Sequence, residues 1–207
     1  IDLVTEIKDD KHPYIDKNAG FDIFSYSIGS FLSEILMMTN KDAYFSNSRF
    51  ISFCGGAVFN RLSPVSKFIL DSEANVSLYS YVVEHLESHM KRDEVLRHYL
   101  SEIHPEGVNF RSMLNYKTLT RYREQKFREM SERIYAITLS EDTVVPAYEV
   151  INTLQGTNRD IPIRVDTLEF PYKYTHEDPF PALENIKEEV TRQFVKTFDL
   201  VCDFLQK

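Results

Sequence analysis

An abrupt change from strand to helix at residues 25–29 limits the possible folds of this chain more than any other feature. Residues 21–26 (FDIFSY) have the pattern of a short buried strand. The following SIGSFLSEILMMTN carries its apolar residues at helical spacing, and no loop residues separate the two patterns. A strand that leads directly into a helix is typical of proteins in which helices pack on a sheet.

Strand and helix patterns continue to alternate downstream. Further strands are predicted at residues 49–54, 133–139 and 161–168, and the last alternates apolar and polar residues as a strand near a sheet edge does. A helix is predicted at 147–154, and a long C-terminal helix follows Pro181. This order predicts an α/β fold with a mostly parallel sheet flanked by helices. The apolar stripe of the last helix comprises Leu183, Ile186, Val190, Phe194, Phe198, Val201 and Leu205.

Residues 62–133 interrupt this alternation with a polar, mostly helical segment. We therefore predict a core formed by residues 1–61 and 134–207, with 62–133 inserted as a helical lid or cap. Ser63-Pro64 is a plausible start for the first inserted helix, and a short helix is also predicted at residues 2–8. Two apolar faces are expected in the insert, one formed by Val76, Tyr79, Val83, Leu86 and Met90, the other by Val95, Tyr99 and Ile103.

Composition excludes several classes of function. The net charge of −8 argues against a phosphate-binding surface, so no nucleic-acid partner is expected. No apolar run approaches the roughly 18 residues of a membrane span, and the acidic start does not resemble a secretory signal, so a cytoplasmic protein is expected. Cys54 and Cys202 lie in apolar stretches and are predicted to be small buried residues without a disulfide or zinc site. We expect no cofactor, since no glycine-rich phosphate loop follows any strand.

Ser27 stands at the strand-to-helix turn, in a pattern of the form small-x-Ser-x-Gly. Such a turn holds a serine hydroxyl above the carboxyl end of the sheet, where it can act as a nucleophile. The amide of the next residue, Ile28, lies at the helix N-terminus and can donate to an oxyanion. The alternative role for Ser27 is an ordinary helix N-cap.

A serine nucleophile needs a base, and the base needs a carboxylate to orient it. Asp142 follows the third predicted strand and His176 follows the fourth, so that acid and base stand at strand ends in the order Ser, Asp, His. Glu141 is the alternative acid and His12 the alternative base. Asp142 could otherwise cap a helix, and His176 could be an ordinary loop histidine.

With these residues in place, the chain resembles the carboxyl-terminal portion of an α/β-hydrolase, from the nucleophile strand onward. The turn Asp142-Thr143-Val144-Val145-Pro146 is the most specific match. The resemblance implies a serine hydrolase that cleaves an ester or amide of a small-molecule or acyl substrate, with Ser27 as nucleophile, His176 as general base and Asp142 as its orienting acid.

The chain departs from that family at two positions and at its start. Ser25 and Leu139 stand where glycine is common, and too few residues precede the first strand to supply the family's earlier strands and second oxyanion amide. We therefore expect an upstream segment, or a second chain as in a homodimer, to cover that strand. The departures favour a second hypothesis, an inactive fold that serves as a binding or interaction module.

Other groups have less specific interpretations. The pair His85 and His89 has a spacing that can bind metal, but a third ligand is missing from the pattern, and packing or surface roles are expected for these and for His98 and His104. The basic segment 117–133 is interpreted as a solvated helix face, with attraction of an anionic substrate as the alternative. Gly55-Gly56 is expected to let the chain turn toward the insert. Tyr26 and Phe59 are candidate pocket residues.

Overall fold

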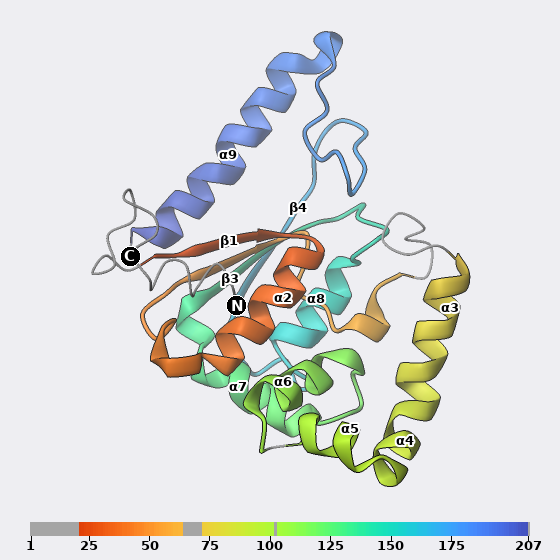
Figure 1. Cartoon of the computed structure of the whole chain (residues 1–207). Coiled ribbons are helices and arrows are strands. Elements are labelled where there is room, and N and C mark those ends of the chain that lie inside the picture. The colour runs from red at the N-terminus through yellow and green to blue at the C-terminus, as the bar shows by residue number, and fades with distance from the viewer. Residues whose placement is uncertain (1–20, 64–71, 102, 207) are drawn as a thin grey trace, which may run out of the picture.

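A computed structural model describes residues 21–63, 72–101 and 103–206 (Figure 1). Three predictions fall outside these ranges or at their border. They are the short helix at 2–8, the helix start at Ser63-Pro64 and the alternative base His12.

Four parallel strands form one sheet in the order β1-β2-β3-β4. The predicted α/β fold with a parallel sheet flanked by helices is therefore confirmed (Figure 1). Ser25, Ser52 and Ala136 lie side by side in the register of the first three strands, and Val165 continues the row. The strands are β1 (Ile23–Tyr26), β2 (Phe50–Phe53), β3 (Ile134–Leu139) and β4 (Arg164–Leu168).

Helices cover both faces of the sheet. α2 (Ile28–Thr39) and α8 (Ala147–Leu154) lie on one side, and α9 (Lys187–Leu205) lies on the other (Figure 1). Because side chains alternate along a strand, Phe50 contributes to the core under α2 and α8, while its neighbour Ile51 contributes to the core under α9. The sheet is thus the middle of three layers.

The two edge strands differ from the two central ones in burial. β2 and β3 are buried along their whole length, as strands of a parallel sheet usually are. β4 is only partly buried, in agreement with the predicted edge position. The sequence predicts a buried strand here, but Phe24 of β1 is 44% exposed. Among the described residues, β1 pairs only with β2 and is therefore an edge strand. The open side of β1 is the edge that we expect an upstream segment or a second chain to cover.

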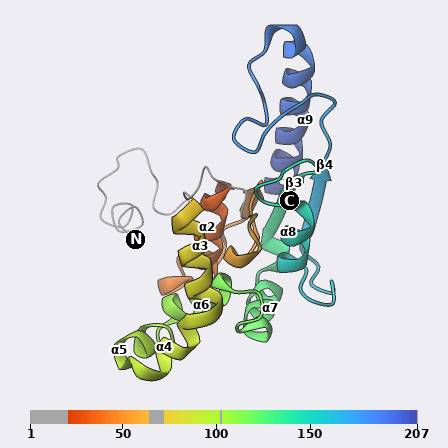
Figure 2. The same cartoon turned by 90° about the vertical axis from the view of Figure 1, so that its right-hand side faces the viewer.

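The insert contains helices on the same side of the sheet as α2, away from α9 (Figure 2). The first predicted apolar face, which runs from Val76 to Met90, is only partly buried. Val82 is buried, whereas Val83 and the upstream Val76 and Tyr79 are exposed. The reason is a π-helical turn at Tyr81–His85, which adds one residue to the helix and shifts the inward-facing register. The insert comprises α3 (Ser72–Ser80), η3 (Tyr81–His85), α4 (Leu86–Arg92), α5 (Glu94–Tyr99), α6 (Pro105–Leu114) and α7 (Thr120–Glu129).

The second predicted apolar face in the insert is not buried at all, since Val95, Tyr99 and Ile103 are each more than half exposed. Helix α5 ends at Tyr99, before the last of these residues. The predicted burial of both cysteines is right for Cys54 and wrong for Cys202, which lies on the exposed side of α9. The short 3-10 turns are η1 (Lys41–Ala43), η2 (Phe59–Arg61), η4 (Ser131–Arg133) and η5 (Glu184–Ile186).

A helix that spans a membrane must be both long and strongly apolar. None of the helices in the described ranges combines the necessary length with a sufficiently apolar sequence.

Candidate active site

Ser27 lies between β1 and α2 in a backbone conformation that side chains rarely adopt. Its φ is 55° and its ψ is −125°. The turn is held on both sides, because the Ser27 amide donates to the Phe53 carbonyl of β2 and the Ser30 amide donates to the Ser27 carbonyl, each at 3.0 Å. A strained residue that its neighbours fix in this way is common at functional sites.

The close packing at this turn depends on Gly55 and not on Gly29, the glycine of the small-x-Ser-x-Gly pattern. A Cβ on Gly29 would lie 4.0 Å from Ser25 Cβ, which is an ordinary contact. A Cβ on Gly55, by contrast, would lie 2.4 Å from Ser30 Cβ and 2.7 Å from the Ser27 carbonyl oxygen. Gly55 therefore allows the segment after β2 to lie directly against the first turn of α2. Ser25 places its hydroxyl 2.5 Å from that of Ser33.

Three side chains from distant parts of the sequence form one chain of hydrogen bonds. Ser27 Oγ lies 2.6 Å from His176 Nε2, and His176 Nδ1 lies 2.7 Å from Asp142 Oδ2. Asp142 follows β3, and His176 lies between β4 and α9. Because parallel strands end at the same edge of a sheet, these loops meet above the turn that carries Ser27.

The Asp142 carboxylate is held in place by the backbone of the turn that follows it. Its Oδ1 accepts hydrogen bonds from the amides of Val144 and Val145, both at 2.9 Å. The other oxygen is then directed at His176. Both side chains are almost completely buried, so the pair is shielded from water. The neighbouring Glu141 is exposed, and Asp142 is the carboxylate that contacts the imidazole.

Tyr26 supports the histidine from one side. Its ring stacks on the His176 imidazole with a centroid separation of 5.5 Å and an interplanar angle of 18°, and its hydroxyl donates to the His176 carbonyl. Burial, followed by nearby negative charges, raises the pKa of the Tyr26 hydroxyl, so that it stays a donor. Burial likewise raises the pKa of the Cys54 thiol, which disfavours a competing thiolate nucleophile.

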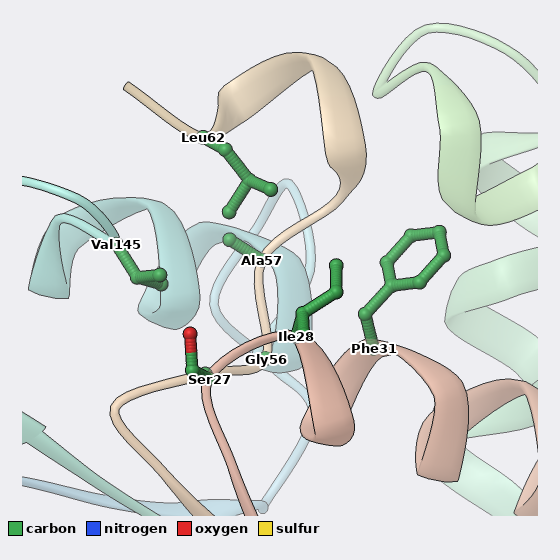
Figure 3. Close-up of a pocket in the computed structure, with 8 residues that line it drawn as sticks. Ser27, Ile28, Phe31, Gly56, Ala57, Leu62 and Val145 are labelled. Atoms are coloured by element: carbon green, nitrogen blue, oxygen red, sulfur yellow. The ribbon is translucent and has the colours of Figure 1, made fainter. Parts of the chain in front are cut away.

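A small cavity of about 10 Å³ adjoins Ser27 (Figure 3). In Figure 3 the hydroxyl of Ser27 points into the space between Val145 and Ala57. Neither of the predicted pocket residues lines this cavity, because Tyr26 packs on His176 and Phe59 packs against the core beneath α2. The lining residues are Ser27, Ile28, Phe31, Gly55, Gly56, Ala57, Leu62 and Val145.

The buried carboxyl of Glu34 on α2 is a feature that the sequence does not predict. This side chain is fully buried, and within the described part of the chain neither carboxyl oxygen has a hydrogen-bond partner. Burial raises its pKa well above the ordinary value, although the charge of Arg123 opposes the shift. Its Oε1 would lie 3.2 Å from a Cβ on Gly56, which places it behind the segment that lines the cavity. The one sequence signal for a buried carboxyl at this position is a single glutamate within an otherwise apolar helix pattern.

The basic segment 117–133 is not simply a solvated face. Arg123 is 1% exposed and donates to the carbonyls of Ser112, Tyr116 and Thr118. Burial lowers its pKa to about 10, but it remains a cation near neutral pH. Its partners are backbone groups of α6 and of the loop before α7, so Arg123 fastens these parts of the insert together.

The other histidines lie apart from the candidate site. His98 and His104 place their Nε2 atoms 2.8 Å apart, and His85 and His89 have ring centroids 6.5 Å apart. All four lie in the insert. Among the residues that the structure describes, no three His, Cys, Asp or Glu side chains gather as a metal site would require.

The fold and these contacts define an α/β protein with a serine–histidine–aspartate chain of hydrogen bonds at the carboxyl ends of its strands, in which the histidine and the aspartate are buried. The model of a family described as "Family of unknown function (DUF6051)" matches residues 1–206, so the chain belongs to that family. No curated protein matches it. Membership of this family does not assign an activity to the chain.

Proposed function

We propose that the protein is a serine hydrolase that cleaves an ester or an amide through an acyl-enzyme. The observation that carries the proposal is the continuous chain from Ser27 Oγ through His176 to Asp142, with contacts of 2.6 and 2.7 Å. These distances are within the reach that proton transfer requires. The strained backbone of Ser27 and the burial of the other two side chains add support.

Each residue has a defined part in the proposed reaction. His176 Nε2 accepts the Ser27 proton as Oγ attacks the carbonyl carbon, and the carbonyl oxygen becomes an oxyanion. The Ile28 amide, at the N-terminus of α2, donates to that oxyanion. His176 then gives its proton to the leaving group, and the same residue activates the water that hydrolyses the acyl-enzyme. Asp142 keeps the imidazole in the tautomer that can accept from Ser27.

The likeness to α/β-hydrolases, with residues 62–133 as a lid, is part of this proposal. The order of strands, the serine at a tight strand-to-helix turn and the acid and base at later strand ends all support it. The substrate would be a small molecule or an acyl compound, and the expected location is cytoplasmic. Cover of the β1 edge, by an upstream segment or by a second copy of the chain, also belongs to the proposal.

The test combines labelling by a fluorophosphonate with hydrolysis of short-chain p-nitrophenyl esters. The wild-type protein should be labelled and should turn over, and Ser27→Ala should lose both. Ser46→Ala is the matched control, because Ser46 is an exposed serine that donates to Ala43 upstream of β2 and should have no effect. A folded wild-type protein that fails to react with any fluorophosphonate or ester would contradict the proposal and favour the binding module. Turnover that survives in Ser27→Ala would contradict it as well.

A further inference from the structure

The segment between β2 and η2 is unusually constrained for a short loop. Cys54 has a φ of 51° and Gly56 has a φ of 98°, whereas Gly55 does not have positive φ. Gly55 is pressed against the first turn of α2, where a Cβ would meet Ser30 at 2.4 Å. Backbone whose φ alternates in sign in this way tends to turn successive N–H groups toward a common concavity that binds anions.

Three consecutive amides of this segment donate to no acceptor in the described part of the chain. The Cys54 amide donates to the Ile137 carbonyl at 2.9 Å, and the Val58 amide donates to Thr153 Oγ1 at 3.3 Å. Between them, the amides of Gly55, Gly56 and Ala57 have no acceptor among the described residues, although all three residues are buried. A buried N–H is nearly always paired, so a run of unused ones needs an explanation.

The cavity next to Ser27 supplies that explanation. Gly55, Gly56 and Ala57 line it together with Ser27 and Ile28 (Figure 3). Its volume of about 10 Å³ is close to the space that one water-sized oxygen occupies. The cavity therefore has room for a single oxygen atom beside the serine hydroxyl.

We propose that the backbone amides of Gly56 and Ala57, with that of Ile28, form the oxyanion hole, so that this chain supplies its own second donor. The inference rests on the proposed serine hydrolase, and it replaces the expectation that an upstream segment provides that donor. Removing one such donor from an oxyanion hole typically lowers kcat by about 10² to 10³.

The surroundings of the segment fit an anion in the cavity. The nearest carboxyl behind Gly56 is that of Glu34, whose Oε1 would lie 3.2 Å from a Cβ on the glycine. A negative charge at that place would oppose an oxyanion. Burial raises the pKa of Glu34 well above its ordinary value, which favours the neutral form. The site thus has amide donors on one side and, behind them, a carboxyl whose burial favours the neutral form.

The first experiment uses the unmodified wild-type chain, labelled with ¹⁵N-glycine. Because the chain has only six glycines, few amide signals have to be assigned. A trifluoromethyl ketone serves as probe. Ser27 Oγ adds to its carbonyl carbon, the Ser27 proton passes to His176, and the carbonyl oxygen becomes an oxyanion. The Gly56 amide proton should move downfield, and those of Gly107 and Gly156 should stay in place. If the adduct forms and the Gly56 signal does not move, the proposal is wrong for Gly56.

The second experiment replaces single amides by esters through incorporation of the corresponding hydroxy acids. Glycolate at position 56 or lactate at position 57 should lower kcat by about 10² or more, with a smaller change in KM. Hydroxyisovalerate at position 58 is the matched control, since the Val58 amide donates to Thr153 and not to the cavity; it should lower stability and leave kcat unchanged.

The outcomes separate the two proposals. If turnover depends on Ser27 but both cavity esters keep kcat within threefold of wild type, the oxyanion hole lies elsewhere and the hydrolase proposal stands. If the wild-type chain neither turns over nor forms the ketone adduct, the hydrolase proposal fails, and this inference fails with it.

Discussion

Replacement of Asp142 by asparagine tests the proposed reaction at the residue whose geometry is best defined. In the wild-type site, Oδ1 accepts from the amides of Val144 and Val145, and Oδ2 faces His176 Nδ1 at 2.7 Å. An asparagine has one oxygen and one NH₂ group, so its orientation decides what the imidazole meets.

The two backbone amides determine that orientation. If the NH₂ group faced Val144 and Val145, two hydrogen bonds worth about 1 kcal/mol each would be lost and buried donors would be left unpaired, at about 1–3 kcal/mol each. The oxygen therefore stays on the amides and the NH₂ group donates to His176 Nδ1. The imidazole then carries its own proton on Nε2 and cannot accept the proton of Ser27.

We expect Asp142→Asn to lower kcat by about 10⁴, which corresponds to about 5.4 kcal/mol of transition-state stabilisation. The assay is hydrolysis of a p-nitrophenyl ester, with the rate of fluorophosphonate labelling as a second readout. Glu141→Gln is the matched control, because it removes the adjacent exposed carboxylate and should change kcat less than threefold. A folded Asp142→Asn protein with kcat within tenfold of wild type would refute the reasoning.

Three further predictions concern the support of the site and the core. Tyr26→Phe should lower the free energy of unfolding by about 1 kcal/mol in urea titrations, because it removes the hydrogen bond to the His176 carbonyl and keeps the stacked ring. Because burial raises the pKa of Glu34, the folded chain holds that proton more tightly than the unfolded chain. The protonated Glu34 carboxyl contributes fully to stability below its ordinary pKa of 4.5. This contribution is lost as the pH rises through the pKa of the folded state, by about 1.4 kcal/mol per pH unit. Glu34→Gln should remove this part of the pH dependence in unfolding measured over a pH series, and an unchanged slope would count against a raised pKa. Phe127→Ala should lower the free energy of unfolding by about 3–5 kcal/mol, since Phe127 is completely buried in the core beneath α2, and a loss below 1 kcal/mol would contradict that packing.

The succession of strands and helices along the chain and the meeting of Ser27, Asp142 and His176 could be predicted because both follow from local patterns. A serine at a strand-to-helix turn, and polar residues directly after strands, are visible without any tertiary information. The parallel arrangement then brings the three loops to one edge of the sheet. What the three side chains do chemically is the prediction that the experiments above address.

Features that depend on tertiary burial could not be predicted in the same way. Arg123 has the same pattern as its exposed neighbours, and only the packing of α6 against α7 makes it an interior cation. Val82 replaces Val83 on the inward face because one π-helical turn changes the helical repeat. The cavity amides at Gly55–Ala57 have no side-chain signature, since the groups involved are main-chain atoms.

The wide separation of the site residues along the chain has a consequence for folding kinetics. Ser27 and His176 are 149 positions apart, and their contact requires β1, β2, β3 and β4 to be paired in sequence across the sheet. Contacts between such remote positions form late, because long loops must close first. The rate at which Ser27 becomes reactive toward a covalent probe during refolding would therefore report the rate of the last stage of folding. Any intermediate that lacks the fourth strand would not react with the probe.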